Sequence, residues 1–152
     1  SAEQLKQADR LHVAAARIYQ LKPDDFMAMN QYAAALIASR QNPETALKLT
    51  SQLLVKWPDS PAARINRSLA CLLNQRTPEA EGLLKTIDAK QLGAKEATAY
   101  YFAWYQVNLN CGEYDQARQM IARIDRQYLF PNESRWLEES QQRISAHGQE
   151  KL

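Results

Sequence analysis

Apolar residues recur along this chain at the three- and four-residue spacing of a helix that buries one side. Met29, Tyr32, Ala33, Leu36 and Ile37, for example, share one face of a helical segment. Proline and short polar stretches interrupt the pattern at intervals, as they do at helix ends. The pattern therefore predicts eight helices, at about residues 3–21, 24–40, 43–56, 60–75, 78–89, 94–111, 114–127 and 132–146.

Two proline positions recur with the same spacing. Pro58 follows Pro23 by 35 residues, and Pro78 follows Pro43 by 35 residues. Two independent landmarks that share one period indicate an internal repeat, and repeats of this length come from stacked pairs of secondary-structure elements. Proline is also tolerated in the first turn of a helix and just beyond its end, so these residues mark helix boundaries.

The third predicted helix pair carries the most specific motif. Tyr101, Trp104 and Tyr105 are spaced to pack against a neighbouring helix, and the segment 112–117 reads Gly-Glu-Tyr-Asp-Gln-Ala. This stretch resembles the Gly-Asp-Tyr-Asp-Glu-Ala turn of the tetratricopeptide repeat, a helix–turn–helix unit with a period of about 34 residues. The two earlier repeats match less well, because Gln41 and Arg76 replace the turn glycine and Glu81 stands where alanine is usual.

The resemblance implies an all-α fold in which helix–turn–helix repeats stack into an α-α superhelix. It implies a single domain over 1–152, with the second helix of a truncated repeat at 3–23, repeats at 24–58, 59–93 and 94–130, and a capping helix at 132–146. A polar outer face on the last helix is what a capping element needs; a docking helix for a partner is the alternative for this segment.

The helix predicted at 3–21 has no first helix to pair with, which favours a fragment of a longer protein. Its apolar face is expected to stay exposed unless a preceding repeat covers it, because each unit of a stack buries its apolar surface against its neighbours. The residues of that face are Leu11, Ala14, Ala15 and Ile18.

Composition supports the fold class. Hydrophobic residues make up 45% of the 152-residue chain, Ala and Leu dominate, and there are only 4 Gly. Because Ala and Leu are strong helix formers and β-branched residues are scarce, all-β and doubly wound α/β folds are excluded.

A net charge of +2 removes the simplest argument for a nucleic-acid partner. The apolar stretches are too short for a membrane span, no signal peptide is visible, and the compartment stays open.

Groups for catalysis are sparse. His12 and His147 lie near opposite ends of the chain, without the spacing of a metal or triad motif, and no glycine-rich phosphate loop is present. Cys71 and Cys111 lie forty residues apart and form no metal-ligand spacing. We read them as small buried thiols, with a disulfide as the alternative. The sequence predicts no enzyme, no cofactor and no metal.

Four residues are candidates for binding a peptide. In the resembled family, the side of the helix that carries Phe102 and Gln106 lines a concave groove, where an aromatic anchors a ligand. Asn66 matches one position of the family's carboxylate clamp, but the cations that complete the clamp are missing. Asn66 and Asn30 are therefore expected to hydrogen-bond the backbone of an extended peptide.

The resemblance implies a protein-binding or scaffolding module that takes a peptide or helix in its groove, with a partner the sequence does not identify. Two alternatives remain. The chain is similar in kind to the small repeat chaperones of bacterial secretion systems, or it is a segment through which a larger regulator or enzyme self-associates into a homo-oligomer.

Overall fold

The computed structural model describes residues 2–150, and the side chains of all of these except 4, 5, 8, 9, 149 and 150. Within this range the chain forms eight α-helices, two short 3-10 helices and no strand, which confirms the all-α prediction. In chain order these are α1 Ala2–Leu21, α2 Phe26–Ser39, α3 Pro43–Lys56, α4 Pro61–Leu73, α5 Thr77–Leu84, η1 Ala89–Gln91, α6 Ala94–Asn110, α7 Tyr114–Ile121, η2 Arg126–Tyr128 and α8 Pro131–Glu150.

Two helices begin slightly later than the predicted residues 24 and 60, because side chains cap their first turns. The Asp25 Oδ2 atom accepts the backbone N–H of Ala28 at 2.9 Å. The Ser60 Oγ atom accepts the backbone N–H of Ala63 at 3.2 Å. Each bond satisfies an N–H group that has no partner inside the helix, so α2 and α4 begin at the residue after the cap.

Helices α5 and α7 are eight residues long, shorter than predicted, and each is followed by a 3-10 turn. Asp88 and Asp125 start these turns, each accepting the backbone N–H two residues later, at 3.1 and 3.2 Å. Such bonds compete with helix continuation. The isoleucine before each aspartate is buried and anchors the turn: Ile87 and Ile124. This Ile-Asp pair recurs at a spacing of 37 residues, 87 to 124, a signal the sequence prediction missed.

The turn that joins the two helices of a pair contains one residue in the left-handed region. These residues are Arg40 with φ 57°, Gln75 with φ 56° and Gly112 with φ 76°. The sequence prediction that Gln41 and Arg76 occupy the position of the turn glycine is therefore wrong by one residue. The left-handed residue lets the chain leave the first helix and satisfies its last carbonyl groups.

Three buried alanines take the same place in the second helix of each pair. Ala46, Ala80 and Ala117 are each the fourth residue of α3, α5 or α7, and each is fully buried. Ala80 therefore takes the position that was assigned to Glu81. A small side chain at a helix crossing lets two backbones approach closely, so this alanine sets the distance between the paired helices.

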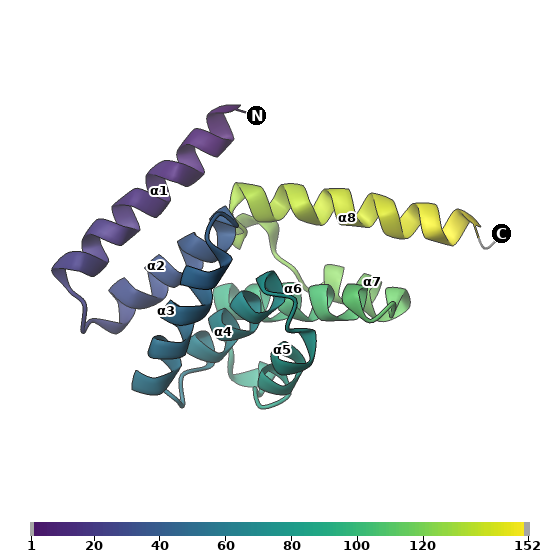
Figure 1. Ribbon diagram of the computed structural model, residues 1–152. Coiled ribbons are helices and arrows are strands. Elements are labelled where there is room, and N and C mark those ends of the chain that lie inside the picture. Colours follow the sequence, from purple (N-terminus) through teal and green to yellow (C-terminus); the bar gives the residue numbers. More distant parts are fainter. Residues whose placement is uncertain (1, 151–152) are drawn as a thin grey trace.

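The helices stack so that each contacts mainly its neighbours in the chain (Figure 1). Helices α2, α4 and α6 lie side by side, α3 packs on α2 and α4, α5 packs on α4 and α6, and α1 and α7 pack on α2 and α6. One continuous apolar core runs through the stack, from Met29 in α2 to Ile144 in α8. No described helix has the length and apolarity needed to cross a lipid bilayer.

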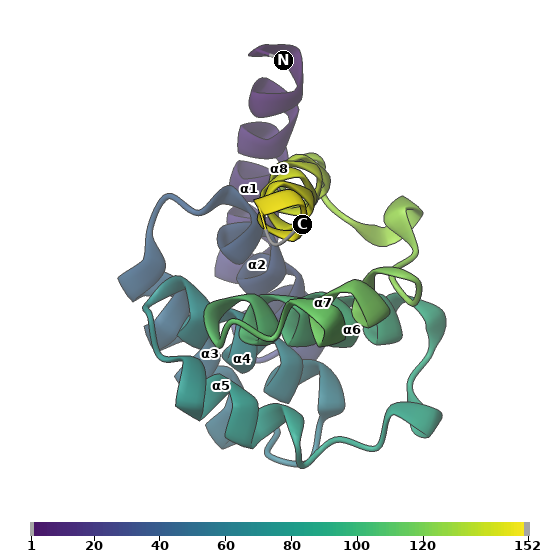
Figure 2. The ribbon, with the colours of Figure 1, turned by 90° about the vertical axis from the view of Figure 1, so that its right-hand side faces the viewer.

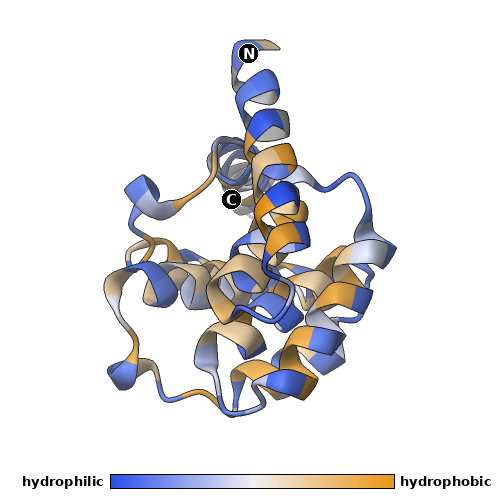
Figure 3. Cartoon of the chain, turned by 90° about the vertical axis from the view of Figure 1, so that its left-hand side faces the viewer, coloured by the Kyte–Doolittle hydropathy of each residue, from blue (hydrophilic) through white to orange (hydrophobic). Residues whose placement is uncertain are grey.

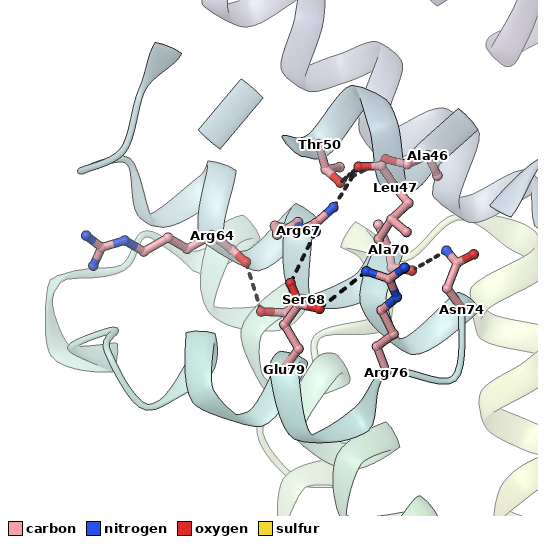
Figure 4. Close-up of polar contacts among 10 residues, drawn as sticks. All are labelled: Ala46, Leu47, Thr50, Arg64, Arg67, Ser68, Ala70, Asn74, Arg76 and Glu79. Carbon is pink, nitrogen blue, oxygen red and sulfur yellow. Dashed lines mark hydrogen bonds and ion pairs between the residues drawn. The ribbon is translucent and has the colours of Figure 1, made fainter. Parts of the chain in front are cut away.

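A partly buried arginine joins three successive helices (Figure 4). The Arg67 Nη1 atom of α4 donates to the backbone oxygen of Leu47 in α3 at 2.7 Å, and its Nη2 atom pairs with Glu79 of α5 at 3.1 Å. Asn74, at the end of α4, donates to the backbone oxygen of Pro43 at 2.9 Å. These polar contacts fix the register of α3 and α5 on α4.

Helix α8 does not stack beside α6 along the array but reaches back to α2 and α1 (Figures 1 and 2). The Trp136 ring lies edge-on to Phe102 and Tyr105 of α6, with centroids 5.6 and 5.8 Å apart. Leu137 and Ile144 of α8 are buried. The last helix therefore covers the C-terminal half of α6 on the inner side of the stack.

Candidate functional site: an inner groove on α2, α4 and α6

A groove with a volume of about 220 Å³ lies where the inner faces of α2, α4 and α6 meet the segment that leads into α8. Its lining is mainly apolar, with a few amide and charged side chains. The lining residues are Phe26, Met27, Asn30, Gln31, Ala34 and Ile37 of α2, Ala62, Ile65, Asn66 and Leu69 of α4, Lys95, Glu96, Thr98 and Ala99 of α6, and Tyr128, Leu129, Phe130 and Glu133.

Two of the four candidate residues meet in this groove. The Asn66 Nδ2 atom of α4 donates to the Oδ1 atom of Asn30 in α2 at 2.7 Å. The same Nδ2 atom lies 3.5 Å from the backbone oxygen of Asn30. Among the described residues, the Asn30 Nδ2 atom and the Asn66 Oδ1 atom make no hydrogen bond. The pair therefore presents an unbonded amide NH2 group, which can donate, and an unbonded amide oxygen, which can accept, to the groove.

The other two candidates do not line the groove. Phe102 is only 2% exposed, because Trp136 of α8 packs against its ring. Gln106, one turn further along α6, is also buried. The side of α6 that the family resemblance assigns to a concave surface is therefore covered by α8, and Phe102 is a core residue. Phe102 is therefore not exposed to anchor a peptide.

One wall of the groove is held by a hydrogen bond between distant segments. The Thr98 Oγ1 atom of α6 accepts the backbone N–H of Asp125 at 3.1 Å, and Thr98 is buried. This bond ties the start of η2 to α6, so that Tyr128 lies at the groove. The 3-10 turn that shortens α7 thus also forms part of the site.

A buried carboxyl group lies at the start of α8. Glu133 is 8% exposed, and its Oε1 atom accepts the backbone N–H of Phe130 at 3.0 Å. This is the reciprocal bond of a capping box. Burial raises the pKa of Glu133 to about 7, although the Phe130 hydrogen bond and the Arg40 guanidinium both act to lower it. The groove therefore borders a carboxyl group that titrates near neutral pH.

The cation nearest to Asn66 in sequence is not available to a ligand. Arg67 already bonds the Leu47 carbonyl and Glu79, and its side chain is only 12% exposed. A carboxylate clamp needs cations that can pair with the ligand. This arginine cannot supply that charge without breaking the α3–α4–α5 contact.

The two cysteines and the two histidines lie outside the groove lining. Cys71 and Cys111 are both free, Cys71 buried and Cys111 exposed, so the interpretation of buried thiols fits only the first. Burial raises the pKa of the Cys71 thiol to about 11, which disfavours its reactive thiolate. His12 stacks near Tyr32 and His147 near Tyr114. Among the described residues, no three His, Cys, Asp or Glu side chains could together hold a metal ion.

Sequence reasoning missed the residues that the C-terminal part of the chain brings to the groove. Tyr128, Phe130 and Glu133 belong to η2 and the start of α8, whereas the other walls come from residues 26–99. A local signal existed, since the Ile-Asp pair at 87–88 recurs at 124–125 and marks a turn. The sequence does not show, however, that this turn lies next to α2 and α4, because its position there depends on how α8 folds back.

Comparison of the chain with protein-family models, with curated proteins and with solved structures finds no significant match.

Proposed function

We propose that this chain is a protein-interaction module that binds an extended peptide segment in the inner groove. The observation that carries the proposal is the Asn30–Asn66 pair, which leaves an amide donor and an acceptor at an apolar groove. A peptide backbone offers the complementary carbonyl and N–H groups at each residue. Apolar side chains of the same segment would contact the lining formed by Ile37, Ile65 and Leu69.

The size of the groove favours an extended segment over a helix. An α-helix with its side chains is about 10–12 Å across, whereas the groove encloses only about 220 Å³. A volume of this kind accepts one or two side chains rather than the whole face of a helix. Since α8 already covers Phe102 and Gln106, the surface that a helix would need is occupied.

The resemblance to tetratricopeptide repeats supports the same proposal, because such repeats generally bind peptides on their inner helices. The support comes from the Gly112 turn, the recurrent buried alanine and the side-by-side order of α2, α4 and α6. We propose in addition that the helix pairs form a superhelical repeat array and that this array serves as a scaffold.

A steric block of the groove tests this function. Peptides would be selected on the wild-type protein from a random-peptide phage library, and their affinities measured by fluorescence anisotropy. Ala34→Phe places a ring in the groove from a position on α2 that is only partly buried. We expect it to weaken binding at least about tenfold, or about 1.4 kcal/mol. Ala122→Phe, at an exposed position outside the groove lining, is the matched control and should bind like wild type.

Two results would contradict the proposal. One is a selection that enriches no peptide on the folded protein. The other is a set of peptides that bind Ala34→Phe as tightly as wild type, which would place the binding surface elsewhere.

A further inference from the structure

The outer face of α1 is apolar and open to solvent. We define this face by Arg10, Val13, Ala14, Arg17 and Ile18, with Leu11 at its edge and Leu21 at its end. Leu11 and Val13 are each 50% exposed, Ile18 is 46% exposed and Leu21 is 83% exposed. Figure 3 looks at the molecule from the side on which α1 lies, and hydrophobic segments alternate with hydrophilic ones along its C-terminal half. Exposed aliphatic side chains gathered on one helix indicate a contact surface.

The repeat period indicates what kind of element covers such a face. Adding the 35-residue period to Leu11, Ala14 and Ile18 gives their counterparts in α3, which are Ala46, Leu49 and Leu53. These counterparts are 0, 6 and 0% exposed, because α3 packs against a helix on each side, α2 and α4. Helix α1 packs against α2 as α3 packs against α4 and also contacts α8, yet Leu11 and Ile18 stay 50 and 46% exposed. The open face of α1 therefore has the geometry of a helix-packing surface.

Charge specifies the occupant further. Arg10 and Arg17 lie on the same face, one on either side of Ala14, and Lys6 extends the positive charge toward the N-terminus. Within the described residues, neither arginine side chain makes an ion pair or a hydrogen bond. Glu3 is the single carboxylate among the described side chains of α1. A partner with carboxylates beside its apolar residues would pair with these cations.

The same charges argue against a second copy of the chain as the occupant. In an antiparallel pair of α1 helices centred on Ala14, Arg10 of each copy would lie near Arg17 of the other. Like charges at close range destabilise an interface. The occupant must therefore differ from α1 in the sign of its flanking charges.

We propose that the outer face of α1 docks an acidic amphipathic helix of a partner protein, whose apolar stripe lies on Leu11, Ala14 and Ile18 and whose carboxylates pair with Arg10 and Arg17. The arrangement repeats the packing of α2 on α3, with an added electrostatic preference. This surface is separate from the inner groove, and its test does not depend on the groove.

The test uses two labelled helical peptides of one design, with leucines at i, i+3, i+4 and i+7 and either glutamate or lysine at the flanking positions. Binding to the full chain would be followed by fluorescence anisotropy. We expect the glutamate peptide to bind at least about tenfold tighter than the lysine peptide. Because the ion pairs are exposed, this preference should shrink between about 0.05 M and 0.5 M salt.

Charge reversal identifies the surface. The double variant Arg10→Glu, Arg17→Glu should lose or invert the preference for the glutamate peptide. The matched control Lys48→Glu, Lys90→Glu reverses two exposed cations on α3 and η1 and should bind like wild type. Equal binding of the two peptides, or an unchanged preference in the Arg10/Arg17 variant, would overturn the proposal. A wild-type dimer in sedimentation, abolished by the same variant, would instead assign this face to a second copy.

Discussion

Backbone conformation at single residues distinguishes the three turns that join paired helices. Arg40 and Gln75 have φ values of 57° and 56°, in the region that Gly112 occupies at the third turn. A residue with a Cβ atom in the left-handed region costs roughly 1–2 kcal/mol. Two turns therefore carry a local strain that the third avoids, and the stack around them compensates for it.

This strain leads to a prediction at the residue scale. Gln75→Gly should stabilise the protein by about 1 kcal/mol, because glycine adopts positive φ without a steric penalty. Gln75 is exposed, and its side chain makes one long hydrogen bond, 3.3 Å to the Leu73 oxygen. Urea unfolding would measure the change, with Gln75→Ala as the control that removes the side chain but keeps the Cβ atom. Equal stability of the glycine and alanine variants would contradict the prediction.

At the scale of elements, α8 is held to α6 by one buried hydroxyl pair within an aromatic contact. The oxygens of Tyr105 and Ser140 are 2.6 Å apart, and both residues are fully buried. Ser140 donates its hydroxyl proton to the Leu137 oxygen at 2.8 Å, so Tyr105 is the donor in the pair. Burial raises the pKa of Tyr105, which keeps its donating proton in place.

This direction of donation predicts unequal costs for the two ends of the bond. Ser140→Ala should destabilise the protein by about 1–3 kcal/mol, because it leaves a buried O–H group without an acceptor. Tyr105→Phe should lower the free energy of unfolding by less, because Ser140 keeps its hydrogen bond to the Leu137 oxygen. The double variant should lose less free energy of unfolding than the two single variants lose together, because the two hydroxyl groups interact. Thermal or urea unfolding of the four proteins checks this, and a neutral Ser140→Ala would contradict it.

At the scale of the whole molecule, the two ends of the stack meet through the start of α8. The Asn132 Nδ2 atom lies 3.4 Å from the backbone oxygen of Ala38, a contact between residues 94 positions apart. The Arg40 guanidinium lies 5.0 Å from the centroid of Trp136, and Glu133 is buried beside it. These contacts tie the start of α8 to the C-terminal end of α2, and they hold Glu133 at the groove.

The buried Glu133 carboxyl makes this closure depend on pH. Its pKa of about 7 lies above the ordinary value of 4.5, so the folded state binds more protons than the unfolded state between these values. Stability therefore falls as pH rises from about 4.5 to 7, by up to about 3 kcal/mol from this group. Glu133→Gln should remove this part of the slope and be more stable than wild type at pH 8.

Urea unfolding of wild type and Glu133→Gln at pH 5 and pH 8 measures that difference, because all other groups titrate alike in both proteins. Glutamine keeps an oxygen that can accept the Phe130 N–H, so the cap is retained. The same pH dependence in both proteins would show that Glu133 does not cause it.

The sequence predicted the number and type of helices well because that information is local. Apolar spacing and proline positions act within a few residues, and all eight predicted helices are present. It predicted the ends of α5 and α7 less well, because it missed the short 3-10 turns that Asp88 and Asp125 start after them. Of the candidate site, Asn30 and Asn66 came together because they occupy similar positions in consecutive inner helices.

The tertiary structure alone decided what α8 covers. The family resemblance placed Phe102 and Gln106 on an open inner face, but Trp136 packs on that face and α8 returns to α2. This path depends on contacts between residues nearly a hundred positions apart, such as Asn132 and Ala38, which no local pattern encodes. The sequence by itself therefore determined an all-α chain of eight helices, and the tertiary structure decided which of its inner residues form a groove and which lie in the core.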